Sequence, residues 1–225
     1  MLIYLLALYL PSGAQESGDS LEKVLNQMDK TAANFHTTQA TFVWDQYSKV
    51  VDTTDTQKGK VYFRRAGKDT QMMAVIAEPE KYVLYGDGKI QMYEPKMDQV
   101  TTFSTGKKAD KADVESFLVL GFGGSGHDLL KAFEVKYLGT EKVNGLETAK
   151  LDLTPKSAKV QGMFGHIVLW IDPVRGVSLQ QQFFDPTSGD YKLNKYSDIE
   201  LNQKIPDNVF KLKTTGKTKF VSPRG

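Results

Sequence analysis

Residues 59–103 constrain the fold more than any other part of the chain, because short extended segments alternate there with turn signals. Apolar side chains recur within each segment, as in strands that have one buried face. The breaks between segments fall at residues 66–69, 78–80, 86–88 and 94–96. Asp87-Gly88, in the third break, favours the positive φ angles of a tight hairpin turn. We therefore expect an antiparallel meander, which forms the wall on which the remaining chain is arranged.

The flanking sequence predicts further strands and a few helices. An amphipathic helix is expected at residues 21–34, where Leu21, Leu25 and Met28 share one helical face. Shorter helices are predicted at residues 111–120 and 128–133, a polar loop at residues 52–58, and strands at residues 39–51, 135–138, 146–154, 166–172, 178–185 and 191–200, with a last edge strand in the tail at residues 213–225.

These elements predict one mainly β domain with helices (α+β). Strands do not alternate with long helices, which argues against a doubly wound parallel sheet. Antiparallel strands in such number tend to curl, because open sheet edges invite aggregation. We expect a half-open antiparallel β-barrel of about ten or eleven strands, with a helical lid over its concave side. A single domain spans residues 21–225.

Composition narrows the class of partner. The chain has 29 Lys and Arg against 27 Asp and Glu, a net charge of +2. Phosphate binding needs a concentrated basic surface, so we expect no nucleic-acid partner. The basic pairs Arg64-Arg65 and Lys107-Lys108 are interpreted as parts of a solvated face. The absence of cysteine excludes disulfides, thiolate chemistry and a cysteine-linked lipid anchor.

The first 14 residues are expected to be a secretory signal peptide. Residues 2–10 are apolar and small residues follow them, with cleavage expected after about Ala14. The run is too short to span a bilayer, which takes about 20 apolar residues. A buried or surface hydrophobic segment is the alternative, since no Lys or Arg precedes the run. Residues 15–20 would then form the flexible mature N-terminus of a soluble protein.

Residues that commonly carry catalysis form no recognisable constellation in the sequence. His36, His127 and His166 lie far apart, without the spacing of a metal site. The glycine-rich stretch at residues 121–126 matches neither a nucleophile elbow nor a phosphate-binding loop, so its glycines are read as a hinge. We expect a protein that is not an enzyme and that uses neither a metal nor another cofactor.

What remains as a candidate site is apolar. Strand residues on one face could line a concave wall, and residues of the mid-chain helical region could cover it. The predicted cavity residues are Phe42, Trp44, Phe63, Met72, Ile76, Leu84, Met92, Phe117, Leu118, Leu120, Phe122 and Leu169. Methionine suits such a surface, because its flexible side chain adapts to irregular gaps. A plain hydrophobic core is the alternative.

The order of short motifs resembles a known family. Gly59-Lys-Val-Tyr-Phe-Arg-Arg65, Glu78-Pro79, Gly86-Asp87-Gly88-Lys89, Tyr93-Glu94-Pro95 and Asp98-Gln99-Val100 resemble the periplasmic outer-membrane lipoprotein carriers, the LolA-like proteins. Ile171-Asp172-Pro173 and the segment at residues 205–210 resemble the C-terminal half of that family. The resemblance extends over residues 21–212.

This resemblance implies a soluble periplasmic carrier. Its cavity would bind the acyl chains of lipoproteins or other lipids, released by an ATP-driven inner-membrane complex and delivered to an outer-membrane acceptor. Arg65 would hold the lid closed by hydrogen bonds to lid backbone, which suits the fixed fork of guanidinium donors. The carrier would act as a monomer. The alternative is an envelope sensor or interaction module of the same fold that binds lipid without transporting it.

Overall fold

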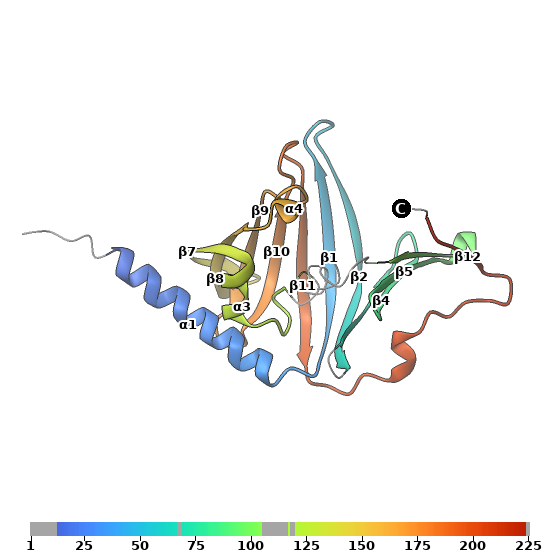
Figure 1. Cartoon of the computed structure of the whole chain (residues 1–225), viewed down its shortest axis with the longest axis horizontal. Helices are drawn as coiled ribbons and strands as arrows, with labels where there is room; N and C mark the ends of the chain where they lie inside the picture. Colours follow the sequence, from blue (N-terminus) through green and yellow to red (C-terminus); the bar gives the residue numbers. More distant parts are fainter. Residues whose placement is uncertain (1–12, 67–68, 105–116, 118–119, 224–225) are drawn as a thin grey trace, which may run out of the picture.

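One continuous sheet makes up most of the structure. The computed structural model describes residues 13–66, 69–104, 117 and 120–223 (Figure 1). Within them, twelve strands follow one another across the sheet in the order β12-β6-β5-β4-β3-β2-β1-β11-β10-β9-β8-β7. Neighbouring strands are antiparallel, apart from the parallel pair of β12 and β6.

The strands are β1 (Thr37–Ser48), β2 (Thr53–Ala66), β3 (Asp69–Ile76), β4 (Lys81–Gly86), β5 (Lys89–Glu94), β6 (Gln99–Ser104), β7 (Phe133–Val143), β8 (Leu146–Pro155), β9 (His166–Asp172), β10 (Val177–Phe184), β11 (Tyr191–Leu201) and β12 (Lys219–Val221). The helices are α1 (Gly13–Ala33), α3 (Gly126–Ala132) and α4 (Ala158–Gln161), with the 3-10 helices η1 (Pro95–Met97) and η2 (Asp207–Phe210). Among these helices, none combines the length and the apolar character needed to cross a membrane.

The mainly β class and the antiparallel pairing are confirmed, and the sheet is open rather than a closed barrel. The predicted number of strands, ten or eleven, was too low. The loop predicted at residues 52–58 was also wrong, because β2 begins at Thr53 and pairs with β1 from the hairpin turn onward. This end of β2 is polar and exposed, so it lacks the apolar alternation of a half-buried strand.

The remaining differences concern the ends of helices. Residues 15–20, expected to be flexible, lie in the first turns of α1. The predicted helix at residues 111–120 falls largely outside the described residues, and so does the apolar run at residues 2–10. The short helix predicted at residues 128–133 is confirmed as α3, and the tail supplies the edge strand β12.

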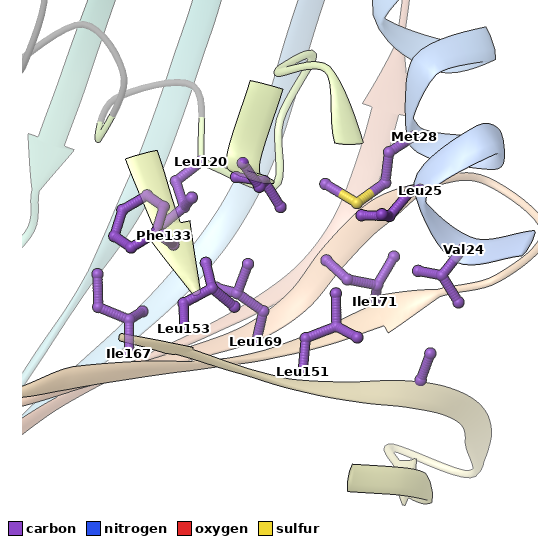
Figure 2. Close-up of a cluster of buried hydrophobic side chains, with 12 residues drawn as sticks. Val24, Leu25, Met28, Leu120, Phe133, Leu151, Leu153, Ile167, Leu169 and Ile171 are labelled. Atoms are coloured by element: carbon purple, nitrogen blue, oxygen red, sulfur yellow. The ribbon is translucent and has the colours of Figure 1, made fainter. Parts of the chain in front are cut away.

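Helix α1 covers one half of the concave face of the sheet. Its apolar stripe includes Val24, Leu25 and Met28, which point toward side chains of β8 and β9, including Leu151 and Ile171 (Figure 2). Each such side chain stabilises the fold by about 1.5–3 kcal/mol when fully buried. The face of α1 toward the sheet is therefore part of a hydrophobic core.

The other half of the concave face is formed by β1 to β4. Its buried side chains form a second cluster, which includes Phe35 after the end of α1 and Phe122 from the loop before α3. Aromatic side chains from two separate segments thus cover this half of the sheet.

The C-terminal segment crosses the convex face. After β11 the chain passes beneath β2 to β4 and ends beside β6 at the sheet edge (Figure 1). Ile205 and Phe210 pack on Met73 there. Arg64 fastens the segment through an ion pair with Asp207, and its guanidinium lies 4.3 Å from the Phe210 ring centroid. The segment thus covers apolar residues on the outer side of the strands that carry the second cluster.

Gly59 provides a test of how β1, β2 and β3 fit together. A Cβ atom at this position would lie 2.0 Å from the Val75 carbonyl oxygen and 2.9 Å from the Phe42 ring. We expect Gly59→Ala to lower the free energy of unfolding by about 1–3 kcal/mol, because backbone must move to relieve the overlap. Urea denaturation measures the change.

Gly86→Ala is the matched control. This glycine also lies in a strand, but a Cβ atom there would meet only the Gln71 side chain at an ordinary 3.8 Å. The control should change stability by less than about 0.5 kcal/mol. Equal effects of the two substitutions would contradict this account of the packing.

Candidate functional site

A cavity of about 360 Å³ lies between the concave face of the sheet and the loop before α3. Its volume falls within the range of small-molecule sites, about 300–1,000 Å³. The residues that line it are Phe42, Trp44, Val61, Phe63, Met72, Ala74, Ile76, Val83, Phe117, Phe122, Gln181, Phe183, Asn194 and Tyr196. Most of these side chains are apolar, which makes the cavity suited to a hydrocarbon ligand.

The lining arises from the two-residue period of the strands. Cross-strand partners share a face, so Val61 of β2, Ala74 of β3 and Val83 of β4 form one row across the cavity. Phe42 belongs to another row and pairs with Gly59, whose missing side chain lets the Phe42 ring lie across β2. Register and one glycine thus shape the cavity wall.

The structure brings together most of the predicted cavity residues but not all of them. Those that line the cavity are Phe42, Trp44, Phe63, Met72, Ile76, Phe117 and Phe122. Leu84 lies on the convex face, because it is one residue out of phase with Val83. Met92 pairs with Val83 and shares its face, but it lies outside the lining.

Leu120 and Leu169 belong to the other cluster, under α1, and do not line this cavity. Leu118 lies outside the described residues. The residues that sequence reasoning missed are Val61, Ala74, Val83, Gln181, Phe183, Asn194 and Tyr196. Strict alternation from Phe63 would have indicated Val61. The missed residues of β10 and β11 could not be predicted, because the sequence does not show which strands pair beside β1.

A small polar group interrupts the apolar lining. The Tyr196 hydroxyl donates to the Gln181 side-chain carbonyl at 3.2 Å, and the Gln181 amide donates to the Leu120 carbonyl. Asn194, two residues before Tyr196 in β11, also lines the cavity. Burial raises the pKa of Tyr196 far above its ordinary value of 10, so the phenol stays neutral at physiological pH.

The loop before α3 forms the cover of the cavity. Phe122 is 1% exposed, and its ring lies between Phe63, with ring centroids 5.6 Å apart, and Tyr196, at 4.6 Å. The backbone of the loop is fixed on β10, where Ser178 N–H donates to the Gly121 carbonyl at 2.8 Å. Phe122 thus occupies space that belongs to the same hollow as the cavity.

Arg65 connects this loop to α1. Its guanidinium donates to the Ala32 carbonyl at 3.1 Å and to the Gly123 carbonyl at 3.2 Å, and it lies 5.5 Å from the Phe35 ring centroid. The carbonyls at a helix C-terminus have no helical partner and carry partial negative charge, which favours a cation there. Arg65 therefore joins the last turn of α1 to the loop that covers the cavity.

A histidine joins the same two elements from the other side. The His127 imidazole contacts Asp29 through Nδ1 and Glu22 through Nε2, the latter at 3.1 Å. The hydrogen bond with Asp29 raises the pKa of His127 above its usual 6.5, and Glu22 adds to this. Burial alone would raise the pKa of Asp29, but hydrogen bonds from Ser125 and His127 lower it to about 2. The charged histidine thus clamps α3 to α1.

The described residues show no second kind of site. His, Asp and Glu side chains do not gather there in any group of three or more that could bind a metal ion.

A family model described as "Uncharacterized protein" matches residues 56–206. The chain belongs to this family. The matched range runs from within β2 to the segment after β11 and leaves out α1 and β1. No curated protein sequence matches the chain.

Solved structures share the fold of this chain at low sequence identity. An uncharacterized conserved protein from Thermus thermophilus is 12% identical, with 91% of this chain and 99% of that chain covered and a TM-score of 0.55. The Pseudomonas aeruginosa MucA/MucB complex is 13% identical, with 88% of this chain and 61% of that chain covered and a TM-score of 0.50. A LolA superfamily protein from Nitrosomonas europaea is 14% identical, with 85% and 97% covered, but its TM-score of 0.41 carries no weight by itself.

At the level of the fold, the predicted resemblance to the LolA-like family is confirmed. The chain spans about three fifths of the chain that it matches in the MucA/MucB complex. At these sequence identities the matches show a shared fold and do not identify a ligand.

The histidine clamp predicts a dependence of stability on pH. Because its folded pKa is raised, protonated His127 stabilises the folded state below pH 6.5, and this contribution is lost as pH rises through the folded pKa. His127→Gln should therefore flatten the fall in urea resistance that the wild type shows between about pH 6 and pH 9.

His36→Gln, at an exposed histidine before β1, serves as the control and should keep the wild-type pH profile. If wild type and His127→Gln lose urea resistance in parallel across this range, then the clamp does not contribute to stability.

Proposed function

We propose that this protein binds the acyl chains of lipids or lipoproteins in its concave cavity and carries them between membranes. The observation that carries the proposal is the 360 Å³ apolar hollow within a hydrophobic cluster. The hollow is partly open and its walls are mostly apolar, so an apolar ligand that fills it removes apolar surface from water.

The energetics of an acyl chain fit this hollow. Burial of hydrocarbon contributes about 0.8 kcal/mol per CH₂, so apolar walls alone supply useful affinity. Binding must also be reversible in a carrier. The loop with Phe122 supports reversibility, because its aromatic ring competes for the same space and its backbone is held by a few hydrogen bonds.

The cellular setting of the proposal follows from the resemblance to the LolA-like family. We place the protein in the periplasm, exported by an N-terminal signal peptide, as a soluble monomer and not as an enzyme. It would receive its cargo from an ATP-driven inner-membrane release complex and deliver it to an outer-membrane acceptor.

An envelope sensor of the same fold is the second candidate. The similarity to MucB in its complex with MucA supports it, since that structure pairs the fold with a protein partner. A sensor would form a stable complex with one membrane protein and would not move lipid between vesicles. A vesicle transfer assay separates the two functions.

Filling the cavity should abolish acyl binding. In Ala74→Phe a large ring would project from the cavity wall. Exclusion of two or three methylenes, at about 0.8 kcal/mol each, weakens binding roughly tenfold or more. Titration with dansyl-labelled undecanoic acid measures the affinity, and thermal melting checks the fold.

Ala33→Phe is the control, because Ala33 is exposed at the end of α1 and outside the cavity. This variant should bind the probe like the wild type. Unchanged affinity in a folded Ala74→Phe variant would place the acyl site elsewhere.

Arg65→Leu is expected to load lipid but to release it poorly. Without the two hydrogen bonds to Ala32 and Gly123, the closed loop loses stability and Phe122 competes less with the ligand. Charged hydrogen bonds contribute about 1.5–3 kcal/mol when buried and less when exposed, so we expect roughly three- to tenfold slower transfer. Transfer of the dansyl probe to acceptor vesicles measures the rate.

Arg64→Leu is the matched control, since this neighbouring arginine binds Asp207 on the convex face. Its transfer rate should equal that of the wild type. Normal transfer in Arg65→Leu would remove the latch from the mechanism, whereas the acyl-binding proposal would stand or fall with the Ala74 variant.

A further inference from the structure

The concave face becomes more polar from one end of β1 to the other. Near the start of β1 the cavity is lined by Phe63 and Met72, which pair with each other across β2 and β3. Further along, Trp44 pairs with Asn194 of β11, which in turn pairs with Gln181 of β10. Hydrogen-bonding side chains thus enter the lining only toward the β1–β2 hairpin.

The gradient continues into a second hollow. A cavity of about 220 Å³ adjoins the first and shares Phe183 with it. Its polar lining includes Gln46, Asp185, Asp190 and Lys192. Gln46 and Lys192 pair across β1 and β11 in the next row of the same face as Trp44 and Asn194. The two hollows therefore follow one another along β1, the first mainly apolar and the second mainly polar.

Asn194 lines the first hollow, in the row next to Gln46 and Lys192 of the second. The Gln181 amide N–H donates to the Leu120 carbonyl, and the Gln181 side-chain carbonyl accepts from the Tyr196 hydroxyl. The Asn194 side chain is half-buried in the lining. One amide offers two N–H donors and a carbonyl acceptor, so capacity remains for a ligand. A few placed polar groups in an apolar pocket fix the orientation of a ligand.

We infer that the cavity binds an acyl amphiphile in one orientation, with its hydrocarbon tail at Phe63 and its ester or amide linkage hydrogen-bonded to Asn194. The headgroup lies in the second hollow, beside Gln46 and Lys192. This inference rests on the proposed function, because it assigns the orientation and the linkage of the ligand in the same cavity. It predicts that the protein distinguishes an acyl ester or amide from a plain alkane.

Orientation is tested by quenching of tryptophan fluorescence. Trp44 lines the polar end of the cavity, and Trp170 lies in a convex-face cluster, so Trp170→Phe leaves one reporter in the cavity. A stearic acid with a nitroxide near its carboxyl end should quench Trp44 several-fold more than one with the nitroxide near its methyl end. In the triple variant Trp44→Phe/Trp170→Phe/Met72→Trp, the reporter lies at the apolar end of the cavity. There the label near the methyl end should quench fluorescence more than the label near the carboxyl end.

The linkage is tested with Asn194→Leu. Loss of one neutral hydrogen bond should weaken binding of palmitoyl methyl ester about three- to tenfold and leave binding of hexadecane unchanged. Gln57→Leu is the control, because Gln57 pairs with Trp44 on the same face but lies outside the cavity lining. That variant should bind both ligands like the wild type.

The outcomes separate this inference from the proposed function. If neither spin-labelled acid displaces the dansyl probe, acyl binding itself fails. If both bind but quench Trp44 equally, or the methyl-end label quenches more, then the orientation is wrong. If Asn194→Leu weakens the ester and the alkane alike, then Asn194 supports the wall and does not read the linkage.

Discussion

The structure depends on how the concave face of a single curved sheet is covered. Antiparallel strands with a two-residue period place all their inward apolar residues on that face, and these residues need cover. Helix α1 covers the half built by β7 to β10 with a hydrophobic cluster. Over β1 to β4 the described cover comes from the loop before α3 and from Phe35 and Phe117, and a cavity lies beneath it.

The loop that closes this half is held by hydrogen bonds and by buried side chains. Arg65 connects it to the end of α1, Ser178 and Gln181 fix it to β10, and His127 ties the following helix to α1. These contacts are hydrogen bonds and ion pairs of modest net strength, about 0.5–3 kcal/mol each. Opening of the loop, which a reversible binding site requires, also exposes Leu120 and Phe122.

The sequence predicted the meander and the amphipathic helix well, because turn residues and apolar periods are local signals. It failed where the outcome depended on partners far along the chain. The polar end of β2 is a strand only because β1 lies beside it. Leu84 and Val83 differ by one residue, and only the register with β3 decides which of them faces the cavity.

The same reason explains which site residues were missed. Gln181 and Asn194 belong to strands more than a hundred residues after β1 in the chain order, and they reach the cavity because β11 pairs with β1. A polar residue in a predicted strand gives no sign of whether it faces water or a ligand. The family resemblance was enough to single out Arg65 in the sequence. Its two partners, the carbonyls of Ala32 and Gly123, are known only from the fold.

The central claim is that the cavity holds acyl chains. It is tested most directly by native mass spectrometry of the protein purified from its own envelope without detergent, followed by extraction and identification of bound molecules. The account predicts a complex heavier than the polypeptide by the mass of an acylated lipid or lipoprotein, which is lost in the Ala74→Phe variant. A bare polypeptide mass, with no acyl compound in the extract and no uptake of added acyl probe, would contradict it.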